Sequence, residues 1–144
     1  MEPADIEALL EAVGARPRRR AQREWGVLVP TAIRGDLPVH VLAAERTLAM
    51  RAFFMRGPDR RHLDVHRRLL RRNLSGYLWR FAVDDDGDVW LLAELPLPAL
   101  GEGTIEQALG ALSTLVDETY ETAVRTGFDV PDDVPLGPPP EAQD

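Results

Sequence analysis

The order in which helix-like and strand-like hydrophobic patterns follow one another limits the folds open to this chain. Apolar residues recur at helical spacing over residues 4–14, 60–75 and 104–127. Strand-like apolar runs occupy residues 25–29, 39–43, 47–55, 77–84 and 88–95. The resulting order is α-β-β-β-α-β-β-α. Because strands do not alternate singly with helices, the sequence predicts an α+β fold in which helices pack on an antiparallel sheet.

The last two strand-like runs are joined at Asp86-Gly87, a pair typical of a tight two-residue hairpin turn. With that turn Val83 faces Trp90 and Phe81 faces Leu92, so we expect this apolar face of the hairpin to pack into the core.

The second helix is amphipathic, with arginines on one side. We expect its buried face to consist of Leu63, Leu69, Leu70 and Leu74, with Val65 at its edge. Asn73 lies among these leucines. Its side chain is therefore expected to bond the backbone where the helix turns into the next strand.

Charge is strongly segregated along the 144 residues, whose net charge is -7. Residues 14–72 carry fifteen of the seventeen basic residues, all arginine, against five acids. Residues 129–144 are acidic and proline-rich, which predicts a flexible tail after a single domain at residues 1–128. The candidate partner-binding or nucleic-acid-binding residues are Arg16, Arg18, Arg19, Arg20, Arg23, Arg67, Arg68, Arg71 and Arg72.

These arginines leave three interpretations open. Guanidinium groups pair with phosphate or carboxylate, so nucleic acid and an acidic protein surface both suit them. They also fit a solvated surface, or pairing with this chain's own acidic third helix and tail.

The sequence offers little for catalysis or metal binding. It has no cysteine, only Ser75 and Ser113 as serines, no Gly-x-Ser-x-Gly motif and no phosphate-binding loop. His62 and His66 have metal-binding spacing, but the glutamate of the metalloprotease motif is absent. Both fall near the middle of the expected apolar face, where a hydrogen-bonded core histidine is the simpler interpretation. We therefore expect no enzymatic activity, no catalytic residue, no metal and no cofactor.

The sequence also lacks the patterns typical of a calcium-binding loop, a membrane-spanning segment and a signal peptide. The aspartates at residues 84–88 match the calcium loop in neither register, so we interpret them as hairpin residues. No apolar run of about eighteen residues occurs, and the acidic start lacks the features of a signal peptide. We expect a cytoplasmic protein with no membrane association.

Several motifs in the second half resemble the YbjN domain family. They are Leu69-Leu-Arg-Arg-Asn-Leu74, Phe81-Ala-Val-Asp-Asp-Asp-Gly-Asp-Val-Trp-Leu91, Glu94-Leu-Pro-Leu97 and Gly127-Phe128. The resemblance spans about residues 60–128. It implies a fold like that of class I type III secretion chaperones and a homodimer that holds other proteins as a chaperone-like or regulatory adaptor. The alternative is an accessory protein that binds nucleic acid or nucleoproteins through its arginine surfaces.

Overall fold

A computed structural model describes residues 1–137; residues 138–144 of the expected tail lie outside this range. The elements in chain order are α1 (Pro3–Ala12), β1 (Arg18–Ala21), β2 (Glu24–Thr31), β3 (Gly35–Ala43), β4 (Thr47–Met55), α2 (His62–Ser75), β5 (Arg80–Val83), β6 (Val89–Pro96), a 3-10 turn (Leu97–Ala99) and α3 (Glu102–Gly127). The predicted α+β class is confirmed, and the expected order gains one strand, β1.

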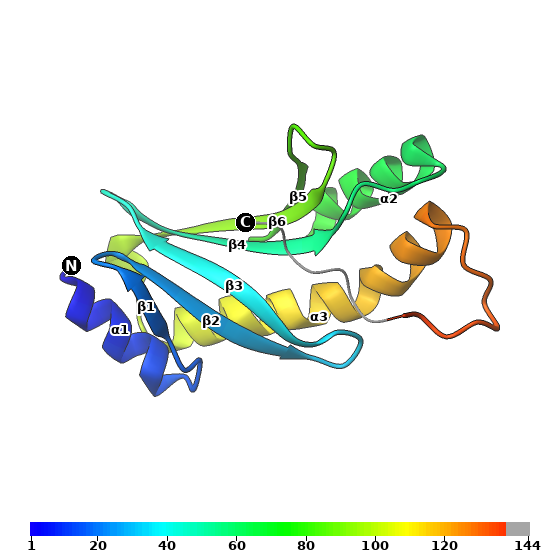
Figure 1. The fold of residues 1–144 in the computed structure, drawn as a ribbon. Coiled ribbons are helices and arrows are strands. Elements are labelled where there is room, and N and C mark those ends of the chain that lie inside the picture. Colours follow the sequence, from blue (N-terminus) through cyan, green and yellow to red (C-terminus); the bar gives the residue numbers. More distant parts are fainter. Residues whose placement is uncertain (138–144) are drawn as a thin grey trace.

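All six strands form one antiparallel sheet in the order β1-β2-β3-β4-β6-β5. Helix α3 runs along one face of this sheet, and α1 lies beside it near β1 (Figure 1). Helix α2 packs against β5 and α3 at the other end of the sheet. The sheet therefore has a helix-covered face and an open face.

The alternation of side chains along β2 shows how the two faces arise. Trp25, Val27 and Val29 are buried toward the helices, whereas Leu28 points to the open face and is exposed. Beyond the sheet, the Trp79 indole N–H donates a hydrogen bond of 2.8 Å to the Ala108 carbonyl of α3. Helix α3 is thus bound to the sheet layer by apolar packing and by a buried hydrogen bond.

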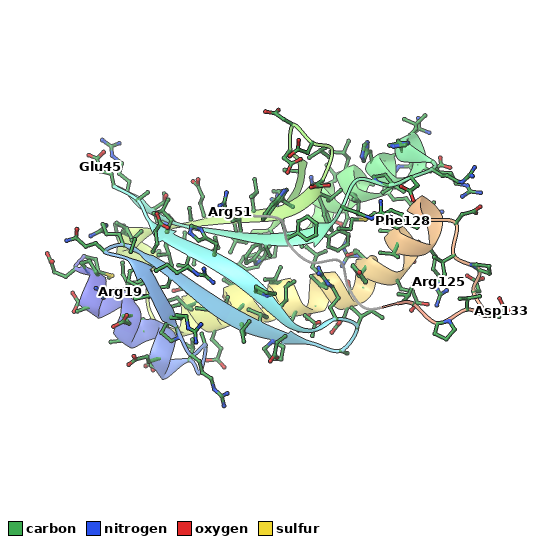
Figure 2. All side chains as sticks on the ribbon, in the orientation of Figure 1. Arg19, Glu45, Arg51, Arg125, Phe128 and Asp133 are labelled. Atoms are coloured by element: carbon green, nitrogen blue, oxygen red, sulfur yellow. The ribbon has the colours of Figure 1, made fainter. Side chains whose placement is uncertain are left out.

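The arginine-rich segment after α1 contains a strand that the sequence pattern did not predict, because residues 18–21 form the edge strand β1. Arg18 pairs with Gly26 and Arg19 with Trp25. The strand alternation places Arg18 and Arg20 on the open face. Arg19 turns toward α1, where its Nε lies 3.1 Å from a Glu7 carboxylate oxygen (Figure 2).

The β5–β6 hairpin differs from its predicted register by one residue. Val83 pairs with Val89, not Trp90, and Phe81 pairs with Leu91, not Leu92. The loop holds three residues and ends at Gly87, whose φ of +86° lies in the left-handed region. The slip moves Trp90 and Leu92 from the expected core to the open face.

Helix α2 also buries a different face from the expected one. Val65 and Leu69 are its buried residues, while Leu63, Leu70 and Leu74 are exposed. The prediction for Asn73 is confirmed: its Oδ1 accepts from the Phe81 N–H at 2.8 Å, and its Nδ2 donates to the Phe81 carbonyl at 3.2 Å.

Helix α3 begins before Thr104, whose hydroxyl accepts a hydrogen bond from the Gly101 N–H at 2.9 Å. It ends at Gly127, where a β-carbon would lie 2.7 Å from the Pro58 β-carbon. Close packing against Pro58 therefore explains this glycine. Arg125 donates to backbone carbonyls of the segment after the helix, next to Asp133 (Figure 2).

Candidate functional site

The structure separates the candidate arginines into two groups at opposite ends of the sheet. Three of them are engaged within the chain: Arg19 pairs with Glu7, Arg23 donates to the Ala43 carbonyl at 2.9 Å, and Arg72 pairs with Glu118 on α3. The others are exposed and form no ion pair within residues 1–137. They are Arg16, Arg18 and Arg20 near the β1 edge, and Arg67, Arg68 and Arg71 on α2.

The first arginine group borders a hollow of about 660 Å³ on the open face, which we call the sheet groove. The groove crosses β1, β2, β3, β4 and β6 and reaches the β5–β6 hairpin. Its basic end is formed by Arg16, Arg18 and Arg20. The strand order therefore places this end at one side of the sheet and the hairpin at the other.

The basic end owes its shape to a glycine. A β-carbon on Gly26 would lie 2.9 Å from Nε of Arg20, so the guanidinium occupies space that only glycine leaves free. Gly26 pairs with Arg18 across the two strands. The local sequence thus allows the Arg20 side chain to lie flat across β2 in the sheet groove.

The middle of the sheet groove is aromatic. The rings of Phe53 on β4 and Trp90 on β6 meet edge to face with centroids 5.2 Å apart. The Arg51 guanidinium stands 5.5 Å from the centre of the Trp90 ring, and Figure 2 shows Arg51 along the upper part of the sheet. Leu28 supplies further exposed apolar surface.

The acidic end of the sheet groove is the hairpin loop, with Asp84, Asp86 and Asp88. The Trp90 indole N–H donates to Asp84 at 2.8 Å, and the backbone N–H groups of Asp86 and Asp88 also donate to this carboxylate. These bonds hold the pKa of Asp84 below its ordinary value. Asp88 accepts from the Gly57 N–H at 2.9 Å. The predicted hairpin role of the aspartates is confirmed, and it fixes their negative charge in place.

A second surface lies where α2 meets β5, and we call it the apolar patch. It consists of the exposed side chains Leu63, Leu70, Leu74, Tyr77 and Val83. Leu70 is 64% exposed and Leu74 is 90% exposed. A contiguous set of exposed leucines on one helix is typical of an interaction surface.

A hollow of about 150 Å³ lies within the apolar patch, between α2 and the hairpin strands. His66 lines it, with Leu69 and Leu70 from the same helix. The His66 Nε2 atom is buried and finds no hydrogen-bond partner among residues 1–137. The expectation of a hydrogen-bonded core histidine is therefore wrong at this atom. The same expectation is wrong for His62, which is exposed and whose ring centre lies 6.3 Å from that of His66.

Sequence reasoning missed the functional candidates outside the arginine-rich segments: Leu28, Arg51, Phe53 and Trp90 in the sheet groove, and the leucines of the apolar patch. The strand alternation contained the signal for Arg51 and Leu28. For Trp90 the signal was masked, because the predicted two-residue turn assigned it to the core face.

The chain was compared with known protein families. Residues 2–124 match the model of the YbjN family, described as "Putative bacterial sensory transduction regulator". This chain belongs to the YbjN family. The YbjN match extends the resemblance seen in the second half of the sequence through α1 and the first strands.

The chain is also similar to curated mycobacterial proteins. The uncharacterized proteins Rv0487 of Mycobacterium tuberculosis and ML2442 of Mycobacterium leprae are 32% and 30% identical over 84 residues, or 58% of this chain and 46% of each relative. This YbjN chain thus spans about half the length of the curated relatives it matches. Across residues 1–137, no helix has the length and apolar character needed to cross a membrane.

Two solved structures share the fold. One is the ExoU–SpcU heterodimeric complex from the type III secretion system of Pseudomonas aeruginosa, with a TM-score of 0.59, 17% identity, and 81% of this chain and 98% of that chain covered. The other is the Yersinia pestis type III secretion chaperone SycH in complex with a YscM2 fragment, with a TM-score of 0.54, 20% identity, and 86% and 98% covered. The YbjN chain therefore has the type III secretion chaperone fold.

Proposed function

We propose that this YbjN protein is a non-enzymatic, cytoplasmic adaptor of chaperone-like or regulatory type that holds protein partners and acts as a homodimer. The observation that carries the proposal is the apolar patch, where leucines of α2 are exposed to solvent beside the edge strand β5. Burying such side chains is favourable by roughly 25 cal/mol per Å² of apolar surface. Burial of the patch against another protein therefore stabilises the complex, and this binding requires no catalytic group.

A second copy of the chain is the occupant we propose for the apolar patch. A two-fold axis there would bring α2 against its own copy, so that the same residues meet from both sides. Edge strand β5 lies beside the patch and leaves no neighbouring strand on its outer side within residues 1–137. The two protomers would then leave both sheet grooves available for other proteins.

The homodimer is tested by measuring molar mass in solution by light scattering coupled to size-exclusion chromatography. We expect the wild type at twice the protomer mass of 16.0 kDa, and the double variant Leu70→Glu with Leu74→Glu at the protomer mass. Leu28→Glu is the matched control, since Leu28 is also an exposed leucine, at 51%, but lies in the sheet groove. A dimer that survives the double variant, or a monomeric wild type, contradicts this part of the proposal.

The adaptor and nucleic-acid alternatives are separated by affinity capture from the native cell, identified by mass spectrometry and repeated after nuclease treatment. The charge of the sheet groove favours proteins, because Asp84, Asp86 and Asp88 repel a phosphate backbone that continues from the arginines along the groove. We expect the captured proteins to survive nuclease. Their loss on nuclease treatment would favour the alternative.

A further inference from the structure

We infer that the sheet groove binds one segment of a partner polypeptide that is acidic at one end, apolar in the middle and basic at the other, laid across the strands. The inference rests on the proposed function, since it names the chemistry of the protein that the adaptor holds. Its basis is the sequence of environments along the groove: arginines at β1, aromatic and aliphatic side chains with His40 and Arg51 among them over β2–β6, and aspartates at the hairpin.

The two charged ends of the sheet groove are too far apart to neutralise each other. Four strand spacings separate β1 from β6, which at about 4.8 Å each amount to about 19 Å. The Debye length at physiological salt is about 8 Å, so each end presents its own field to solvent. A ligand with one kind of charge would gain at one end and be repelled at the other. A segment with opposite charges at its two ends is attracted at both.

The basic end is positioned to bind carboxylates. Arg16, Arg18 and Arg20 are exposed and have no acidic partner within residues 1–137. Arg20 lies flat over Gly26, which restrains a guanidinium that would otherwise move freely in water. Because such an arginine loses less side-chain conformational entropy on binding, a carboxylate pairs with it more favourably than with a freely moving arginine.

The acidic end is rigid for a different reason. Three donors hold the Asp84 carboxylate, and Asp88 is bonded to the Gly57 N–H, so the loop that carries Asp86 keeps one shape. The Asp86 carboxylate is exposed. A lysine or arginine of the partner can therefore meet a fixed negative charge at Asp86.

The middle of the groove recognises apolar side chains. Leu28, Phe53 and Trp90 line a floor whose backbone groups are already paired within the sheet ladder. The floor therefore offers side-chain contacts rather than backbone hydrogen bonds. An extended segment rises about 3.3 Å per residue and crosses about 19 Å in about six residues. Charge at the two ends would then set the direction of the segment.

The test uses the full chain and an end-capped synthetic peptide of about ten residues, long enough to span the groove. Glutamates stand at one end, leucine and phenylalanine in the middle, and lysines at the other end. A scrambled peptide of the same composition, with alternating charges, is the ligand control. Trp90 is half-buried in the groove, whereas Trp25 and Trp79 are buried in the core, so acrylamide quenching of tryptophan fluorescence reports occupancy.

We expect the segregated peptide to bind about tenfold more tightly than the scrambled one and to protect Trp90 from acrylamide. Arg18→Glu with Arg20→Glu should weaken binding by about tenfold or more. Arg67→Glu with Arg68→Glu, two exposed arginines on α2, is the matched control and should leave binding unchanged. Gly26→Ala displaces Arg20 without touching the core, so it should weaken binding while the fold is retained.

Equal affinity for the two peptides, equal loss in both arginine pairs, or tighter binding of single-stranded DNA than of the segregated peptide overturns the inference. The proposed function fails on different evidence. If the peptides do not bind but the wild type remains a dimer that captures nuclease-resistant partners, only the inference is lost. If capture yields no protein after nuclease treatment, the adaptor function is lost whatever the peptides do.

Discussion

Asn73 joins helix α2, which carries the apolar patch, to strand β5 at the edge of the sheet. Replacing Asn73 tests how much its hydrogen bonds to β5 stabilise the fold. Its amide offers one donor and one acceptor and meets the N–H and C=O of Phe81 at 2.8 and 3.2 Å. Asn73 thus makes the two hydrogen bonds that a neighbouring strand would make with Phe81 at the free edge of β5. The Asn73→Ala variant loses both bonds and leaves two backbone groups without their partner.

The size of the effect follows from those two bonds. A net hydrogen bond contributes about 1 kcal/mol, and the site is only partly open to water, so we expect Asn73→Ala to lower the free energy of unfolding by about 2 kcal/mol. For a chain of this length that corresponds to a fall in Tm of about 6 °C. Urea unfolding followed by tryptophan fluorescence measures it, with the protomer concentration held constant because a dimer is stabilised by mass action.

Asn73→Asp supplies the pH signature. At pH 7 its second oxygen faces the Phe81 carbonyl without a proton, so this variant should be at least as unstable as Asn73→Ala. Only the protonated acid can donate, which raises the folded pKa of the new carboxyl above the unfolded value of about 3.9. The penalty is therefore absent below that value and appears as pH rises through the folded pKa. An Asn73→Ala variant within about 0.5 kcal/mol of wild type would refute the reasoning.

Further predictions concern α3 and the hairpin loop. Gly127→Ala should lower the free energy of unfolding by about 1–3 kcal/mol, because its β-carbon would lie 2.7 Å from that of Pro58. A β-carbon at Gly110 in the same helix meets nothing within 4 Å, so Gly110→Ala should raise the free energy of unfolding by about 0.5–1 kcal/mol. Thermal unfolding of the two variants checks both predictions, and equal Tm values would contradict the packing role of Gly127. The pKa of Asp84 is lowered by the Trp90 indole, so its contribution to stability is present above the unfolded pKa and is lost as pH falls through the folded pKa. Asp84→Asn should therefore flatten the loss of stability in acid, and an unchanged acid profile would count against this assignment.

Elements with a clear hydrophobic period could be predicted from the sequence. The strands β2, β3 and β4 and the helix α3 appear close to their expected positions, because each buries one regular apolar face. Strand β1 could not be predicted in this way. All four of its residues are exposed, so an arginine-rich edge strand carries no apolar alternation. Its existence depends on pairing with β2.

The errors at the two surfaces share a cause. Helix α2 has two apolar faces, one with Val65 and Leu69 and one formed by the exposed leucines of the apolar patch. Helical periodicity alone does not show which of the two faces packs against the rest of the chain. In the hairpin both turn lengths place apolar residues on one face, and only the three-residue loop that ends at the left-handed Gly87 decides the register. Apart from Leu92, the leucines and the tryptophan misassigned to the core lie in the candidate site: Leu63, Leu70 and Leu74 in the apolar patch and Trp90 in the sheet groove.

Hydrogen exchange measured by mass spectrometry at high and low protein concentration locates the surface through which two copies of the chain meet. We expect dilution to raise the exchange rates of peptides from α2 and β5, while β1 and α1 exchange at the same rates at both concentrations. The Leu70→Glu, Leu74→Glu double variant should show the dilute pattern throughout. Concentration-dependent protection at β1 or α1, with α2 and β5 unaffected, would contradict this expectation.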